Sequence, residues 1–177
     1  MTMESVRSRL VEKRRWSAYL LTFEGHEALG AFLEIEEDMP APDYWRLLGD
    51  AWTAADSVAP NLDTWRRLFS SPLPHRDHLM RESERPLLAA LPDEVTAYRG
   101  HSHEGGARGL AWTLSRESAE KFAHQFATST DMGYPTGDPL LATVVVPRAA
   151  ILGLFQDRRE GDVVILDLPA DVHVEPL

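Results

Sequence analysis

Cysteine is absent from the chain. Its absence excludes disulfide bonds, a thiolate nucleophile and cysteine-built zinc sites, because each of these requires a sulfur atom. The rest of the composition is ordinary for a globular protein, with 44% hydrophobic and 26% charged residues. A chain of 177 residues with this composition is expected to form one domain, or one compact domain with a helical preamble.

Positive charge is scarce as well. The chain has 18 lysines and arginines against 28 aspartates and glutamates, which gives a formal net charge of −10. This balance argues against a nucleic-acid partner, since contacts to phosphates need clustered basic side chains. A single basic pocket for a small anionic ligand is compatible with it.

Long apolar runs and several well-known motifs are also missing. No run approaches the ~18–20 apolar residues that span a bilayer, so no membrane association is expected. The first residues lack the basic, apolar and small-residue order of a signal peptide, which makes a cytoplasmic location the expectation. The glycine patterns of dinucleotide- and phosphate-binding loops are absent, as is the Gly-x-Ser-x-Gly elbow of serine hydrolases.

The first half of the chain is predicted to be helical. Good helix formers, or apolar residues at three-and-four spacing, predict helices over 7–23, 27–37, 43–52, 65–69 and 76–90. Asp43 is expected to cap the third of these helices. Segments rich in proline, serine or asparagine separate the later helices.

After Pro92 the pattern changes to short β-favouring segments. Strands are expected at 95–99, 110–114, 141–146, 163–166 and 172–174. A glycine-rich loop over 100–109 follows the first strand, and a helix over 116–127, capped by Ser115, follows the second. Helices first and a sheet afterwards indicate the α+β class.

Three motifs in the second half carry the functional signal. They are Tyr98-Arg99-Gly100, Gly109 to Ala123 and Arg158 to Ile165. In this order they resemble the arginine–serine–glutamate branch of the ADP-ribosyltransferases. In that family an arginine ends the first strand, a Ser-Thr-Ser-like strand leads into a helix, and a Glu-x-Glu motif precedes a late strand. The resemblance covers residues 95–165. It implies a helical region (1–91) packed on an NAD-binding core with a split β-sheet (92–177), or one integrated domain.

The resemblance also implies roles for particular residues. Arg99 would bind NAD through its planar fork of donors, and an acidic residue of the Glu160-Gly161-Asp162 motif would supply the catalytic carboxylate. Thr113 or Ser115 would orient the nicotinamide ribose. The other candidates for contact with the cofactor are Tyr98, Gly100, His101, Ala111, Trp112, Phe122 and Tyr134. Spacing favours the core for Trp112 and Phe122, and Tyr134 is the candidate stacking aromatic.

Two positions depart from the family pattern. Ala111 stands where the first hydroxyl is usual, and Asp162 stands where the catalytic glutamate is usual. Because aspartate is one methylene shorter, a misplacement of ~1 Å can reduce a rate by about a hundredfold. Two registers stay open, with either Asp162 or Glu160 as the catalytic residue. Glu160 as the first acidic residue of the motif suggests an arginine acceptor by analogy.

The resemblance predicts transfer of ADP-ribose from NAD to a macromolecule, a protein side chain in particular, by a phage or bacterial effector or toxin. NAD hydrolysis without transfer is one alternative. Another is a binding module on the same fold that has lost catalysis and acts through protein contacts. No metal is expected: His101, His103 and Glu104 lack a further local ligand, and His75 with His78 reads as an exposed pair.

Overall fold

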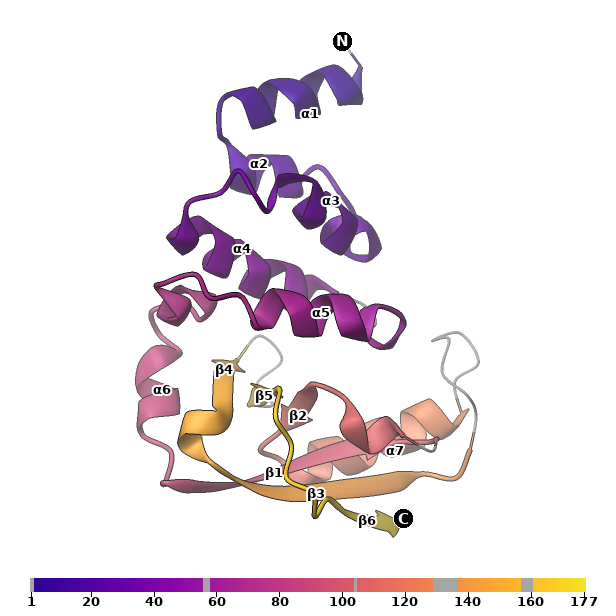
Figure 1. The fold of residues 1–177 in the computed structure, drawn as a ribbon. Coiled ribbons are helices and arrows are strands. Elements are labelled where there is room, and N and C mark those ends of the chain that lie inside the picture. Colours follow the sequence, from indigo (N-terminus) through magenta and orange to yellow (C-terminus); the bar gives the residue numbers. More distant parts are fainter. Residues whose placement is uncertain (1, 56–57, 104, 129–136, 157–160) are drawn as a thin grey trace. The chain divides into compact units, whose positions relative to one another are not determined.

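The computed structural model describes residues 2–55, 58–103, 105–128, 137–156 and 161–177. The chain is mixed α+β, as the sequence predicts, with a six-stranded antiparallel sheet. It forms two compact units (Figure 1). The first comprises Met1–Ser57 and Pro72–Arg81, and the second comprises Val58–Ser71 and Glu82–Leu177. Among the described residues, no helix is both long and apolar enough to cross a membrane.

The first unit is helical. Its elements are α1 (Met3–Glu12), α2 (Trp16–Leu20), the 3₁₀ turn η1 (Gly25–Glu27), α3 (Ala28–Ile35), α4 (Ala41–Ala54) and the 3₁₀ turn η3 (Arg76–Leu79). The side chains of Phe32, Trp45 and Leu48 are fully buried in its core. Tyr19 is buried as well and donates a hydrogen bond to Glu34. Burial and this carboxylate raise the pKa of Tyr19 to about 12.

Three helix predictions in the first half need correction. The helix expected over 7–23 is divided into α1 and α2, because Arg14 adopts a positive φ of 51° that a helix cannot accommodate. Helix α4 begins at Ala41 after the extended Pro40, so Asp43 lies in the first turn and is not the cap. The helix expected over 76–90 is divided into η3 and α6 (Arg85–Ala89), since Met80 between them is extended.

The second unit contains the sheet. Its strands are β1 (Glu94–His101), β2 (Ala111–Thr113), β3 (Leu140–Pro147), β4 (Ile151–Phe155), β5 (Asp162–Ile165) and β6 (His173–Pro176). They are ordered β4-β5-β2-β1-β3-β6 across the sheet, and each neighbouring pair is antiparallel. The unit also contains η2 (Ala59–Asn61), α5 (Leu62–Phe69), α6, η4 (Gly106–Arg108), α7 (Arg116–Thr128) and η5 (Arg148–Ala150).

Strand β4 was not expected from the sequence. Its residues, Ile151 to Phe155, form a short apolar run of the kind that a buried strand requires, so a signal was present. The other strands lie where β-favouring segments predicted them, with ends shifted by up to two residues. Helix α7 also lies where it was predicted, and the Ser115 hydroxyl accepts a hydrogen bond from the amide of Ser118 at its start.

Helix α7 packs directly against the backbone of β1 at Gly100. A Cβ atom added to Gly100 would overlap the carbonyl oxygen of Ala119 and lie 2.5 Å from the amide nitrogen of Ala123. Ala119 and Ala123 are themselves completely buried. Three small residues thus allow the helix to approach the strand so closely that no side chain fits between them. Gly100, a candidate for contact with the cofactor, therefore lies directly against a helix of the same chain.

We expect the substitution Gly100→Ala to destabilise the protein by about 3 kcal/mol, because the added methyl group must push α7 away from β1. Gly30→Ala is the control, since Gly30 lies in α3 with nothing within 4 Å of an added Cβ. It should raise stability by about 0.5–1 kcal/mol. Urea denaturation monitored by tryptophan fluorescence measures both values. Equal stability of the Gly100→Ala variant and the wild type would contradict the packing described.

Candidate functional site

Three of the predicted site residues lie in one row across adjacent strands. Tyr98 of β1 is directly opposite Thr113 of β2, and Thr113 is directly opposite Asp162 of β5. Residues opposite each other in an antiparallel sheet project from the same face. Tyr98 and Asp162 are half-buried, and Thr113 is buried between them. The sheet therefore aligns a phenol, a hydroxyl and a carboxylate that are far apart in the sequence.

Arg99 projects from the other face of β1, because it follows Tyr98 directly and side chains alternate along a strand. Its Nε donates to the carbonyl of Gly106 at 2.7 Å, and its Nη1 donates to the carbonyl of Ala111 at 2.6 Å. The guanidinium group lies so close to Gly109 that a Cβ atom there would overlap it. Arg99 thus fastens the loop before β2 to β1. The fold does not bring Arg99 and Asp162 onto one face of the sheet.

His101 lies two residues further along β1 and is 3% exposed. Its Nδ1 is 3.0 Å from the carbonyl oxygen of His103. A carbonyl oxygen only accepts, so Nδ1 carries the proton and Nε2 carries the lone pair. Among the described residues, Nε2 has no hydrogen-bond partner. Burial lowers the pKa of His101. The hydrogen bond to His103 raises this pKa in part, and the charges of Arg99 and His103 lower it further.

The hydroxyl groups of the motif take part in starting α7. The Oγ1 of Thr113 accepts a hydrogen bond from the amide of Ser115 at 3.2 Å. The Oγ of Ser115 accepts one from the amide of Ser118 at 3.1 Å. Ala111 pairs with Val164 of β5 and brings no side-chain hydroxyl. The turn from β2 into α7 therefore uses both of these hydroxyl groups, which were expected to orient a ribose, as hydrogen-bond acceptors.

The aromatic candidates divide between core and surface. Trp112 is 2% exposed, and its Nε1–H donates to the carbonyl of Gly109 at 3.0 Å, which makes it a core residue. Phe122 is half-buried on α7 and stacks on Phe126, with ring centroids 6.1 Å apart. Tyr134, together with Glu160 of the acidic motif and Glu104, lies outside the described residues.

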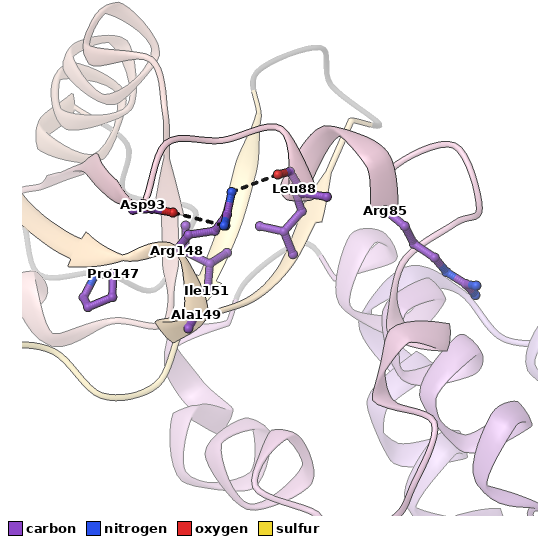
Figure 2. Close-up of a pocket in the computed structure, with 8 residues that line it drawn as sticks. Arg85, Leu88, Asp93, Pro147, Arg148, Ala149 and Ile151 are labelled. Atoms are coloured by element: carbon purple, nitrogen blue, oxygen red, sulfur yellow. Dashed lines mark hydrogen bonds and ion pairs between the residues drawn. The ribbon is translucent and has the colours of Figure 1, made fainter.

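A pocket of about 400 Å³ opens at the other end of β1 and β3 (Figure 2). Arg148 lines it and donates to the carbonyls of Ala89 at 2.9 Å and Leu91 at 2.6 Å. The same guanidinium group pairs with Asp93 at 3.1 Å. These contacts satisfy carbonyl groups at the end of α6, a common role for arginine at a helix C-terminus. None of the residues proposed from the sequence lines this pocket.

Comparison with known proteins yields no match to a family model, a curated protein or a solved structure.

We expect Arg99→Ala to lower the free energy of unfolding by about 2 kcal/mol, because two carbonyl groups lose a charged donor. Arg99→Lys should recover less than half of this loss, since an ammonium group lacks the planar fork. Arg108→Ala replaces an exposed arginine of the same loop and should change stability by no more than about 0.5 kcal/mol. Urea titration measures all three variants. If Arg99→Ala and Arg108→Ala are equally stable, Arg99 does not hold the loop.

Stability should also fall in acid because of His101. A histidine with a lowered folded-state pKa contributes stability that is present above its unfolded pKa of about 6.5 and is lost as the pH falls through the folded value. His101→Asn should therefore flatten the dependence of the urea midpoint on pH between about 7.5 and 5. His26→Asn is the control, because His26 is exposed. An unchanged pH dependence in His101→Asn would contradict the lowered pKa.

Proposed function

We propose that the sheet-bearing unit binds NAD and transfers its ADP-ribose to a side chain of an acceptor protein. Phage and bacterial effectors of the ADP-ribosyltransferase family, which the sequence resembles, carry out this reaction. The observation that carries the proposal is the row of Tyr98, Thr113 and Asp162 across β1, β2 and β5. It sets a carboxylate beside two hydroxyl-bearing residues, which is the set of groups that a ribose and a developing positive charge require.

The strand contexts of the motifs support the proposal. Arg99 lies near the end of the first strand of the sheet, and β2 runs directly into α7. Asp162 is the first residue of β5, and β5 is the neighbour of β2. The arginine, the strand that leads into a helix and the acidic motif therefore follow one another in the same order as in the family that the sequence resembles, although Asp162 lies within the late strand and not before it.

The chemistry assigns Asp162 the central role. The bond between the ribose C1 and the nicotinamide nitrogen breaks, and its electron pair leaves with nicotinamide. An acceptor nucleophile then bonds to C1 and releases a proton. The Asp162 carboxylate would stabilise the oxocarbenium-like state between these events, and it would do so more strongly in the transition state than in bound NAD. Arg99 would act here as a positioning residue that holds the loop before β2 in place.

A second candidate function is a binding module that has lost catalysis. The hydrogen bonds of Arg99 favour it, since this guanidinium group already donates to the carbonyls of Gly106 and Ala111. The absence of a hydroxyl at Ala111 favours it too. In this case the chain would act through protein–protein contacts and would not turn over NAD.

The test is incubation with labelled NAD, alone and with a cell lysate, using the wild type, Asp162→Asn and Asp167→Asn. Asp167 is the matched control because it is an exposed carboxylate just beyond β5. We expect label on a protein band, or released nicotinamide, with a loss of about 100-fold in Asp162→Asn and none in Asp167→Asn.

Two other outcomes are informative. Activity that survives in Asp162→Asn but is lost in Glu160→Gln assigns the catalytic role to Glu160. No transfer of label, together with no heat of NAD binding in calorimetry, overturns the proposal and leaves the binding module.

A further inference from the structure

The segment Pro72–Arg81 of the first unit brings together the side chains of His75, Asp77 and His78. Each offers one potential ligand atom, and these atoms all lie within 4.8 Å of one another. We propose that this triad binds a divalent transition-metal ion of the Zn²⁺ type. The proposal concerns the unit without the sheet and does not depend on the NAD chemistry.

The start of the segment is fixed on helix α4. The Nε1–H of Trp45 donates to the carbonyls of Leu73 at 3.2 Å and Pro74 at 3.0 Å, immediately before His75. The guanidinium group of Arg76 lies over the Trp45 ring, 5.5 Å from its centroid. Trp45 is itself completely buried. Trp45 therefore holds the backbone just before His75, and it also contacts the side chain of Arg76 just after it.

The end of the segment is fixed on the same helix. Leu79 and Met80 follow the triad directly and are 3% and 8% exposed. The carbonyl group of Leu79 lies against Gly49 of α4, where a Cβ atom would be only 3.3 Å from the carbonyl carbon. The triad thus lies between two anchored points, and its backbone is ordered before any ion binds. Such preorganisation lowers the entropy cost of forming a metal site.

The backbone of His75 supplies a further observation. His75 has φ 66° and ψ 35°, a left-handed conformation that is rare for residues other than glycine. It costs about 1–2 kcal/mol, and such strain is concentrated at functional sites. His75 directly precedes η3, and its ring lies 6.0 Å from that of His78. The strained conformation therefore places two imidazoles side by side on a short turn.

The donor set determines which ion is expected. Two imidazole nitrogens and one carboxylate suit Zn²⁺, whereas Mg²⁺ and Ca²⁺ prefer oxygen ligands alone. Bonds of about 2.0–2.1 Å to Zn²⁺ require the three ligand atoms to approach one another further. Side-chain rotation can achieve this, since His75 and Asp77 are exposed and His78 is half-buried. Three protein ligands leave a fourth position for water, as in open zinc sites.

The test is titration of the full-length, chelator-treated protein with ZnCl₂ by calorimetry at pH about 7.5, where an ordinary imidazole is neutral. Co²⁺ serves as a second probe, because its visible absorption reports nitrogen coordination. We expect one equivalent of Zn²⁺ to bind per chain. Affinity should fall by at least ~10-fold in His78→Ala and in Asp77→Asn. His26→Ala, at an exposed histidine of the same unit, should bind as the wild type does.

His75→Gly separates metal binding from folding. Glycine adopts a positive φ without strain, so this variant should be at least as stable as the wild type without metal. It should nevertheless lose Zn²⁺ affinity, and the rise in melting temperature that Zn²⁺ produces in the wild type should disappear. No binding to the wild type, or equal affinity in the wild type and the three triad variants, overturns the proposal. The metal titration contains no NAD, so its outcome tests the metal site alone and leaves the proposed transfer of ADP-ribose to its own experiment.

Discussion

The sheet-bearing unit depends on the direct contact between the backbone of β1 and helix α7 at Gly100. The contact leaves no room for a side chain, so it fixes how closely the helix packs on the strand. Because residues of β1 alternate between faces, it also fixes which face Tyr98 shares with the helix and which face Arg99 takes. The pairings of β1 with β2, and of β2 with β5, extend this assignment to Thr113 and Asp162. The close approach at Gly100 and the pairing of the strands together determine the arrangement of the candidate site.

On the opposite face, β1 and the loop that follows it hold each other in place. Arg99 donates to Gly106 and Ala111, and His101 donates to His103. These hydrogen bonds satisfy backbone carbonyl groups of the glycine-rich loop and of the first residue of β2. The Arg99 guanidinium group and the Nδ1 of His101 therefore have structural partners before any ligand is considered. The arginine and histidine that are typical of a cofactor site therefore also have a structural role here, which is to hold the glycine-rich loop in place.

The helical unit is organised around one buried aromatic side chain, that of Trp45. Trp45 is completely buried in α4, and its single N–H is shared between two consecutive carbonyls of the segment that carries His75, Asp77 and His78. A buried indole N–H requires a hydrogen-bond acceptor, and the carbonyl groups of a segment without regular secondary structure require a donor. This hydrogen bonding orders the segment in which two histidines and a carboxylate converge.

The sequence by itself determined the features that depend on local periodicity and on capping. These include the α+β class, α3, α7 with its Ser115 cap and the positions of most strands, because each is encoded within a few neighbouring residues. The breaks at Arg14 and Met80 lie at backbone conformations that the helix-favouring pattern did not reveal, and β4 was missed although its apolar run is a local signal. Only the tertiary structure set Asp162 beside Thr113, turned Arg99 away from both and gathered the triad of His75, Asp77 and His78. Strand pairing and side-chain direction join residues that are distant along the chain, and no local pattern records them.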